Sequence, residues 1–543
     1  MDKRIRLTAL MLAASLLLNM VVLPVSAEEE AAPFSSLMSQ ENEPTQAPET
    51  TTAHQETTAA PTTEATEEAT TAPEETTEAS TEASTETTEE TAETTQETEE
   101  AETEPELSLM ADMDVPVPVN NTYTINSLAQ LVGLSTLPAS DYANSTIEIV
   151  IKSGDLSTEQ FNGLGSSDAP FAGSLIFNGD AEANLTLSRP LFNYLSSQAT
   201  CTVNNSANGG YLQLTDSNAE EGLLAKVLAG TGTGSSWKVA VFNSRADDVQ
   251  PYSVPIIGTM EAGSAIELSV KDEYRYPVRS ANAGLLCGTM EENTKLTLTD
   301  YAQTEEKETG YFVVATSGAA GGLVGKMGKN AQLTVKPALR FPAKTIQASG
   351  GAGNLVGEMG EGAVLTVQDD LTCAAPLTAG GSGGSLVGQM GKNAQLTLEG
   401  ELAVKVTTVS AGSDAGGLVG RMAEGAALSL TKATDITVAA DISGSNAGGL
   451  VGEMKNGARL SGVSGTDSVT IQGTVTGKSH AGGLIGIAEN LVLDGSMPEV
   501  TAQKITGGTT AGGLLGSYTY SDATGGAYHG EGNYPAVTAN LSD

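Results

Sequence analysis

Two aspartates, Asp435 and Asp467, are the residues whose type and spacing most suggest chemistry. Each stands in a Thr-Asp pair just before a run of β-forming residues, and 32 residues separate them. If the chain forms stacked coils of that length, the two carboxylates would lie about 5 Å apart, as in retaining glycosidases. The alternative is that aspartate recurs as a corner residue that hydrogen-bonds its own backbone. Repeat proteins reuse their corner residues, so we favour the second interpretation.

Aromatic residues between Trp237 and Phe312 are a second candidate, in this case for carbohydrate binding. They include Trp237, Tyr274 and Tyr276. Exposed aromatic rings present flat apolar faces with a polar rim, which suits sugar rings. The alternative, which we favour, is ordinary packing within the fold.

Other signatures of catalysis or metal binding do not occur in the sequence. The three histidines, His54, His480 and His529, have no partner at metal-ligand spacing, and there is no HExxH or GxSxG motif. The three cysteines are too few for a disulfide scaffold, so we expect them to be small core residues. We therefore expect no cofactor, no metal ion and no enzymatic activity.

The elements that would position these residues come from a repeat, best seen in AGGLVGKMGKNAQLTV (residues 320–335). We mark each copy by its first leucine or the equivalent residue. The copies follow one another at intervals of about 30 to 37 residues, and such a period predicts a stacked architecture. The eleven marks are Leu191, Leu223, Ile256, Leu286, Leu323, Leu355, Leu386, Leu418, Leu450, Leu484 and Leu514.

Each copy contains short apolar runs that are rich in β-forming residues and bounded by glycine or asparagine. A third, looser run follows in each copy, such as ITVAADI (residues 436–442). Three short strands and three corners in about 31 residues describe one coil of a parallel β-solenoid, an all-β fold. Residues at equal offsets should then stack from coil to coil, about 4.8 Å apart.

Three ladders follow from this stacking. A methionine ladder, four residues after each mark, and a leucine ladder, ten after, should form the core; a soft-metal site is the less favoured interpretation of the methionines. A glycine ladder, two after each mark, indicates either a strained corner or a place too crowded for a Cβ atom. The methionines are Met260, Met290, Met327, Met359, Met390, Met422 and Met454, and the glycines include Gly325, Gly357, Gly388, Gly420 and Gly452.

The residues three after each mark are polar in the same coils, and we expect them on the solvent-exposed face. We call them the Met-side column. Its central members are Lys326, Glu358, Gln389, Arg421 and Glu453.

The first part of the chain has a different composition. Residues 1–27 have basic residues, an apolar run and a Val-Ser-Ala site, as in a secretory signal peptide. An uncleaved anchor is the rival interpretation. Residues 28–107 hold 24 of the 67 acidic residues and no lysine or arginine, which predicts a disordered, extended stalk.

The folded region begins near residue 120. Residues 123–134 have the leucine spacing of a short amphipathic helix that Asn126 or Ser127 could cap, and STIEIVIKSGDL alternates as a strand. We expect residues 120–190 to form an N-terminal cap and first coil, which covers the strand edges, and residues 191–543 to form the repeat solenoid.

The phrase PFAGSLIFNG, then LFNYL and iterated AGGLVG resemble secreted bacterial proteins with GLUG-motif repeats. The motif Gly-Leu-hydrophobic-Gly occurs at residues 322–325, 417–420, 449–452, 483–486 and 513–516. The resemblance covers residues 120–543 and implies a right-handed parallel β-helix of adhesin type.

The net charge of −41 argues against a nucleic-acid partner, since few side chains could neutralise phosphates. We expect a secreted, cell-surface solenoid with a structural or adhesive role. Its partners would be host or cell-surface glycans or proteins, and we expect no stable membrane insertion after signal cleavage. Two rivals are a β-helix enzyme that acts on polysaccharide and a spacer that carries a functional domain beyond residue 543.

Overall fold

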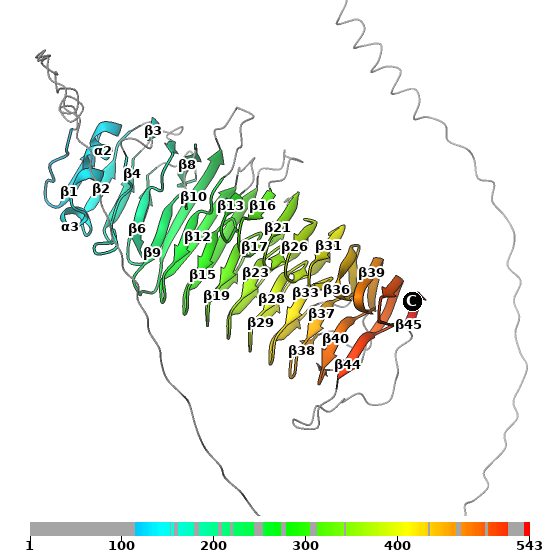
Figure 1. Ribbon diagram of the computed structural model, residues 1–543. Helices are drawn as coiled ribbons and strands as arrows, with labels where there is room; N and C mark the ends of the chain where they lie inside the picture. The colour runs from blue at the N-terminus through cyan, green and yellow to red at the C-terminus, as the bar shows by residue number, and fades with distance from the viewer. Residues whose placement is uncertain are drawn as a thin grey trace, which may run out of the picture. The chain divides into compact units, whose positions relative to one another are not determined.

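A computed structural model shows the arrangement of the chain (Figure 1). It describes residues 114–542 apart from 152–153, 157–160, 179–183, 205–208, 218–220, 244–252, 273–277, 304–311, 341–343, 433–434, 463–467, 495–497 and 520–536. The expected signal peptide and stalk lie outside these residues. No helix among the described residues is long and apolar enough to cross a membrane.

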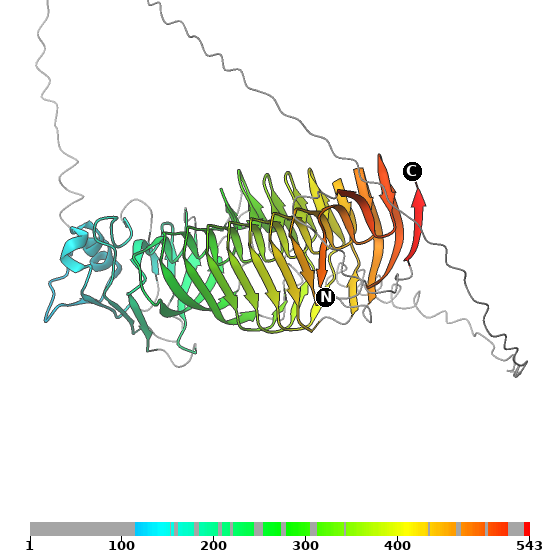
Figure 2. The same ribbon diagram turned by 90° about the horizontal axis from the view of Figure 1, so that it is seen from below.

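The described residues form a parallel β-solenoid, which confirms the expected fold class (Figure 2). Each coil contributes strands to three long sheets, and neighbouring coils pair in parallel through their equivalent residues. In the coils with the clearest repeat, every strand therefore pairs with its equivalent about 31 or 32 residues away. The predicted contact between residues at equal offsets follows directly from this register.

The first long sheet has eleven strands, and we call it the Met sheet because it carries the methionine ladder. The eleven strands match the eleven copies found in the sequence, since every mark comes one or two residues before the start of one of them. They are β6 (Phe192–Ser196), β9 (Ala225–Ala229), β11 (Ile257–Met260), β14 (Cys287–Met290), β18 (Val324–Met327), β23 (Val356–Met359), β28 (Val387–Met390), β33 (Val419–Met422), β37 (Val451–Met454), β40 (Ile485–Glu489) and β44 (Leu515–Thr519).

The second long sheet has twelve strands and carries the leucine ladder, so we call it the Leu sheet. Its strands are β3 (Gly154–Leu156), β5 (Leu185–Leu187), β8 (Leu212–Asp216), β10 (Ser235–Asn243), β12 (Ala265–Asp272), β15 (Lys295–Gln303), β19 (Gln332–Val335), β24 (Val364–Val367), β29 (Gln395–Leu398), β34 (Ala427–Leu430), β38 (Arg459–Ser461) and β41 (Val492–Asp494).

The third long sheet has eighteen shorter or bent strands, because the looser run of each coil turns a corner before it reaches the next mark. They are β13 (Val278–Ser280), β16 (Phe312–Ala315), β17 (Ala320–Gly321), β20 (Leu339–Arg340), β21 (Thr345–Ala348), β22 (Ala352–Gly353), β25 (Leu371–Cys373), β26 (Leu377–Ala379), β27 (Gly383–Gly384), β30 (Leu402–Val404), β31 (Thr408–Ala411), β32 (Asp414–Gly416), β35 (Asp435–Val438), β36 (Asp441–Gly448), β39 (Ser468–Gly482), β42 (Glu499–Gly507), β43 (Thr510–Gly512) and β45 (Val537–Ser542).

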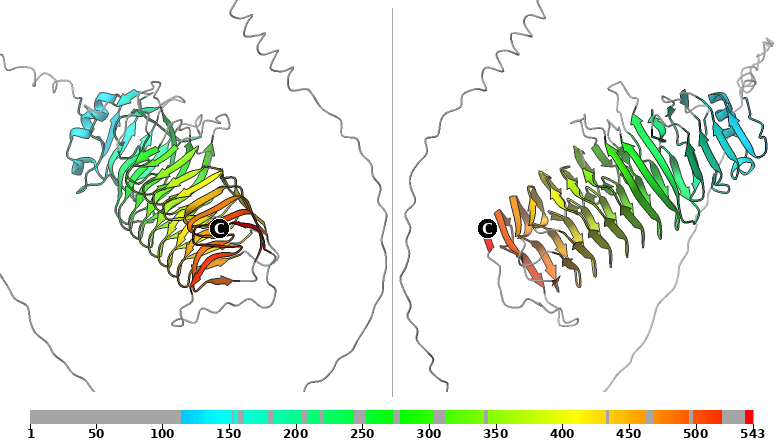
Figure 3. Two further views of the ribbon diagram at one scale, coloured as in Figure 1. Left: turned by 45° about the vertical axis from the view of Figure 1, so that its right-hand side comes forward. Right: turned by 180° about the vertical axis from the view of Figure 1, so that it is seen from behind.

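A cap lies at the N-terminal end of the coils, as the sequence predicted (Figure 3). It contains helix α2 (Leu128–Thr136), helix α3 (Ala139–Tyr142) and a small parallel sheet of β1 (Thr122–Ile125), β2 (Thr146–Ile149), β4 (Ser174–Phe177) and β7 (Thr200–Val203). The Ser127 hydroxyl caps α2 by accepting a hydrogen bond from the Gln130 amide at 3.2 Å. The helix therefore begins later than predicted, because residues 122–125 alternate in burial and pair with β2 instead.

The core confirms the two apolar ladders. All seven methionines of the ladder are at most 2 % exposed, and so are the leucines ten residues after the marks. Burial of each such side chain stabilises the coil stack by about 1.5–3 kcal/mol. The interior is therefore a continuous apolar column that neighbouring coils complete for one another.

The glycine ladder is explained by crowding and not by backbone strain. None of its five central members has a positive φ angle. A Cβ atom built on Gly388 would lie 2.5 Å from the Ala352 nitrogen and 2.6 Å from the Gly357 oxygen, both in the preceding coil. The Met sheet therefore packs directly against the corner segment of the preceding coil, which includes Ala352.

Candidate functional site

Of the two aspartates singled out from the sequence, Asp435 is the one whose place the structure describes. Asp435 lies on β35 with an exposed side chain, and its strand partner is Ser468. The Asp435 carboxylate accepts hydrogen bonds from the Ser468 amide (3.1 Å) and hydroxyl (2.6 Å), and these bonds lower its pKa. Asp467 lies outside the described residues. Asp435 therefore bonds Ser468 at the start of β39 in the next coil, whereas the corner interpretation expected a bond to its own backbone.

The aromatic hypothesis is wrong for Trp237. This side chain is fully buried in β10, and its ring packs edge-on against Phe192, with the centroids 5.8 Å apart. Its indole nitrogen donates to the Ser235 hydroxyl at 2.9 Å. Side chains alternate between the core and the solvent along β10, and Trp237 occupies a core position. Burial of an aromatic side chain removes about 150–250 Å² of its surface from water, which favours this packing. Tyr274 and Tyr276 lie outside the described residues.

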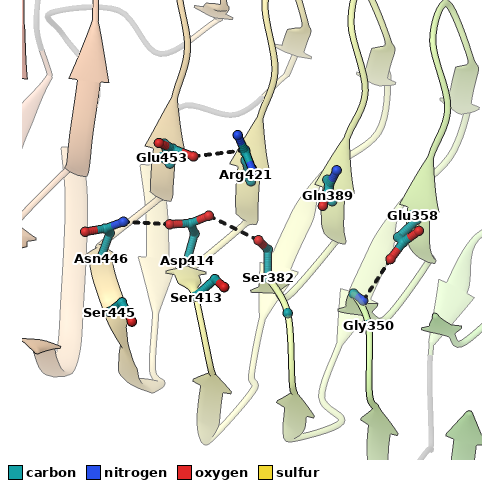
Figure 4. Close-up of a pocket in the computed structure, with 12 residues that line it drawn as sticks. Gly350, Glu358, Ser382, Gln389, Ser413, Asp414, Arg421, Ser445, Asn446 and Glu453 are labelled. Atoms are coloured by element: carbon teal, nitrogen blue, oxygen red, sulfur yellow. Dashed lines mark hydrogen bonds and ion pairs between the residues drawn. The ribbon is translucent and has the colours of Figure 1, made fainter. Parts of the chain in front are cut away.

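The site with the most functional potential is a polar groove of about 380 Å³ that crosses four consecutive coils (Figure 4). The Met-side column forms one wall. The residues four before each mark form the other wall, and we call them the corner column. The first wall is Glu358, Gln389, Arg421 and Glu453, and the second is Gly351, Ser382, Asp414 and Asn446.

The fold places both walls from local sequence. In each V-G-x-M strand of the Met sheet, the glycine faces the corner segment and the methionine enters the core, so the residue between them points outward. The side chains of Glu358, Gln389, Arg421 and Glu453 are consecutive partners in the strand register. Because Gly350, Gly351 and Gly381 carry no side chain in or beside the corner column, the space between the walls stays open.

The corner column is joined from coil to coil by side-chain hydrogen bonds. The Asp414 carboxylate accepts from the Ser382 hydroxyl at 3.2 Å and from the Asn446 amide at 2.8 Å. One ring nitrogen of His480 lies 2.7 Å from the Thr510 hydroxyl, so the same column stays polar two coils further on. These bonds fix the orientation of the wall before any ligand arrives.

Asp414 is a groove residue whose carboxyl pKa is shifted from its usual value. Its side chain is only 4 % exposed, and this burial raises the pKa of the carboxyl above its usual value. The hydrogen bond from Asn446 opposes that shift, and the negative charge of Glu453 adds to it. A carboxyl group in such surroundings can hold a proton at a higher pH than an exposed aspartate can.

Glu453 lies between two cations on the opposite wall. Its carboxylate is 2.9 Å from the Arg421 Nε atom and 2.7 Å from the Lys455 Nζ atom. Lys455 also pairs with Glu489 at 2.6 Å, and its hydrogen bonds to the two glutamates raise the pKa of the lysine. Glu453 is 8 % exposed, so the expectation of a fully solvent-exposed column is wrong at this coil, because its cationic partners cover it.

The walls are bridged at one end of the groove and open elsewhere. The Gly351 amide donates to the Glu358 carboxylate at 3.2 Å, which ties the walls together in the first coil. Among the described residues, the Gln389 side chain has no hydrogen-bond partner, and it points into the open part (Figure 4). The groove therefore offers one free amide and one guanidinium beside three carboxyl groups.

A second groove, of about 480 Å³, lies on the N-terminal coils. Its lining contains no charged side chain; it is Ser197, Gln198, Thr200, Cys201, Thr233, Gly234, Ser235 and Ser236. Burial raises the pKa of the Cys201 thiol to about 12, so this sulfur stays protonated and is a poor nucleophile.

The other two cysteines do not line this groove. Burial raises the thiol pKa of Cys287 to about 12, and it shifts the thiol pKa of Cys373 in the same direction.

No group of three or more histidine, cysteine, aspartate or glutamate side chains within the described part of the chain could hold a metal ion. Comparison with protein-family models, with curated proteins and with solved structures gave no match to this chain. Functional inference therefore rests on the polar groove and on the solenoid that carries it.

Proposed function

We propose that the protein is a secreted, cell-surface solenoid that binds an extracellular ligand along its lateral polar groove. The groove is the observation that carries this proposal, because it combines fixed polar side chains from four coils with open space between them. Preformed hydrogen-bonding groups bind with less loss of conformational entropy than mobile ones do. The leader-like residues 1–27 and the acidic composition of residues 28–107 support secretion and display.

A relationship to GLUG-motif surface proteins is part of the same proposal. Its support is that each of the five Gly-Leu-hydrophobic-Gly motifs enters a strand of the Met sheet at the same point of the coil. The repeated motif thereby has a common structural role, which is to bring a crowded glycine against a corner.

The test of this proposal has two parts. First, the full chain is followed by immunoblot in cell fractions and by protease treatment of intact cells, where we expect it outside the membrane. Second, the secreted full chain is applied to an array of glycans and extracellular-matrix proteins. Retention of the chain in the cytoplasm, or no binding to any arrayed ligand, would contradict the adhesive role.

Hydrolysis of a polysaccharide is a second candidate, favoured by the pairing of Asp414 with Glu453 in one groove. Asp414 has a raised pKa, as a general acid needs, and Glu453 on the opposite wall contacts two cations. If this candidate is correct, Asp414→Asn abolishes the release of reducing ends from neutral polysaccharides. Asp435→Asn, outside the groove, should leave that release unchanged. Absence of reducing-end release by the wild-type chain would reject hydrolysis and leave binding intact.

A further inference from the structure

We propose that the groove binds a linear, neutral or amino-sugar glycan that lies along the solenoid axis, with one sugar unit in each of four coils. This inference rests on the proposed binding function and specifies its ligand. We call the side chains that one coil contributes to the groove a rung. Three features of the groove support the inference: the spacing of the rungs, the charge of the walls and the chemistry of the lining side chains.

The first observation is the spacing of the rungs. Each coil presents a polar residue on the Met-side wall, and three of the four also present one on the corner wall. Successive coils are about 4.8 Å apart, so four coils span about 14 Å. The sugar units of an extended, equatorially linked pyranose chain follow one another at a closely similar distance, with successive units turned to present opposite faces. An extended peptide repeats its side-chain direction every two residues, about 6.6 Å, and would lose register within about two coils. The spacing therefore favours a linear glycan over a peptide.

The second observation is charge. The walls carry three carboxyl groups, from Glu358, Asp414 and Glu453, against one guanidinium from Arg421. Arg421 is itself 2.9 Å from Glu453, so much of its charge is already paired. A chain of uronate or sulfated sugars would bring anions against this surface, and like charges at close range suppress binding. The ligand is therefore neutral or carries amino groups.

The third observation is the kind of side chain that lines the groove. Carboxylate, amide and guanidinium groups are planar, and each can contact two neighbouring hydroxyl groups at once. The unpartnered Gln389 amide at the centre offers both a donor and an acceptor, and the Ser413 and Ser445 hydroxyls line the outer edge. No aromatic ring lines the groove, so recognition depends on hydrogen bonds to hydroxyl or acetamido groups.

The ends of the groove set its length. In the coil before Glu358, the corner position is Ala319 and Lys326 points out to solvent. In the coil after Glu453, Ile487 takes the Met-side position. The groove lining therefore runs through four coils, with polar side chains on both walls in three of them, which predicts four sugar-binding positions.

The test measures binding of soluble oligosaccharides to the full chain by calorimetry or NMR titration. The probes are oligomers of two to six units from three series: β-1,4-glucose, β-1,4-N-acetylglucosamine and galacturonate. We expect affinity in one of the first two series to rise about threefold or more per unit up to the tetramer and then to level off. Galacturonate oligomers should bind at least about tenfold more weakly.

Two matched variants locate the binding site. Gln389→Ala removes the free amide in the groove and should weaken tetramer binding at least about threefold. Gln395→Ala removes an exposed amide from the Leu sheet of the same coil and should leave binding unchanged. Equal affinity of Gln389→Ala and the wild type, tightest binding of galacturonate, or binding of none of the series would overturn the inference. If the chain still adheres to proteins or other glycans on the array, the proposed adhesive function survives that result.

Discussion

Replacement of Gly388 by alanine tests the contact on which the whole solenoid depends. The new Cβ atom would lie 2.5 Å from the Ala352 nitrogen, 2.6 Å from the Gly357 oxygen and 2.8 Å from the Ser382 oxygen. All three are backbone atoms, and the Ala352 amide is itself bonded to the Ser382 oxygen at 3.1 Å. No side-chain rotation can relieve these contacts, so the Met sheet and the corner must separate.

The loss in the free energy of unfolding caused by Gly388→Ala can be estimated from two opposing effects. Overpacking in a well-packed core costs about 1–3 kcal/mol, and three backbone contacts place Gly388→Ala near the upper end. Loss of glycine's freedom in the unfolded chain offsets about 0.4–1 kcal/mol, because φ at Gly388 is not positive. We therefore expect a net loss of about 2 kcal/mol.

Hydrogen exchange is the suitable assay, because a repeat protein can open coil by coil and need not unfold in one step. A loss of about 2 kcal/mol should speed amide exchange in β23 and β28 about 30-fold, with smaller effects on distant coils. Gly232→Ala is the matched control, since its Cβ atom would meet no atom closer than 3.5 Å. Exchange in Gly388→Ala that equals exchange in this control would refute the crowding explanation of the glycine ladder.

Two further predictions concern the same coil and its neighbour. Met390→Asp or Leu396→Asp should prevent folding, because an unpaired buried charge costs several kcal/mol. Gln389→Asp should change the free energy of unfolding by about 0.5 kcal/mol or less. Equal melting temperatures of the three variants would contradict the assignment of Met390 and Leu396 to the core. Since the folded pKa of Asp414 is raised above 3.8, the ionised carboxyl destabilises the fold, and stability is lost as pH rises through the folded pKa. Asp414→Asn should therefore gain stability over the wild type as pH increases from 4 to 7 in urea titrations, and an unchanged difference between the two would count against a raised pKa.

The sequence was sufficient for the coil architecture for a physical reason. In a parallel in-register stack, residues at equal offsets become neighbours, so repetition in the sequence translates directly into contacts. Met327, Met359 and Met390 were predicted to stack, and they are strand partners in that order. The prediction of the core needed only the period and the apolar residue types, because each coil can bury its side chains only against the next.

Predictions that depended on counting across irregular coils were less successful. Asp435 and Asp467 have the same offset from their marks, but the coil after Leu450 contains one extra residue before its third strand. The register is in step at Ser429 and Ser461, and it has slipped by one where Asp435 meets Ser468. A single insertion is enough to exchange the partners of every following residue in the coil.

The groove was missed because its two walls, although only seven residues apart within each coil, lie on either side of a corner and use different residue types. The sequence did place Gln389 and Arg421 on an outward column, but it gave no reason to connect them with Ser382 or Asp414. That connection depends on the glycine ladder, which brings the Met sheet within contact distance of the corner. The available signal was the run of small polar residues four before the marks, which becomes meaningful only once the glycine is known to be crowded.

The solenoid separates positions that specify the fold from positions that are free to specify a ligand. Gly388, Met390 and Leu396 each contact the neighbouring coils, so their replacement disturbs the stack. Gln389 lies between two of them in sequence, yet its side chain has no partner in the described structure, so its replacement should alter only one rung of the groove. Since each coil contacts only its neighbours, such rungs can change one at a time without loss of the scaffold. The order of polar residues along the two walls, and not the repeat itself, is therefore where the specificity of this protein should be sought.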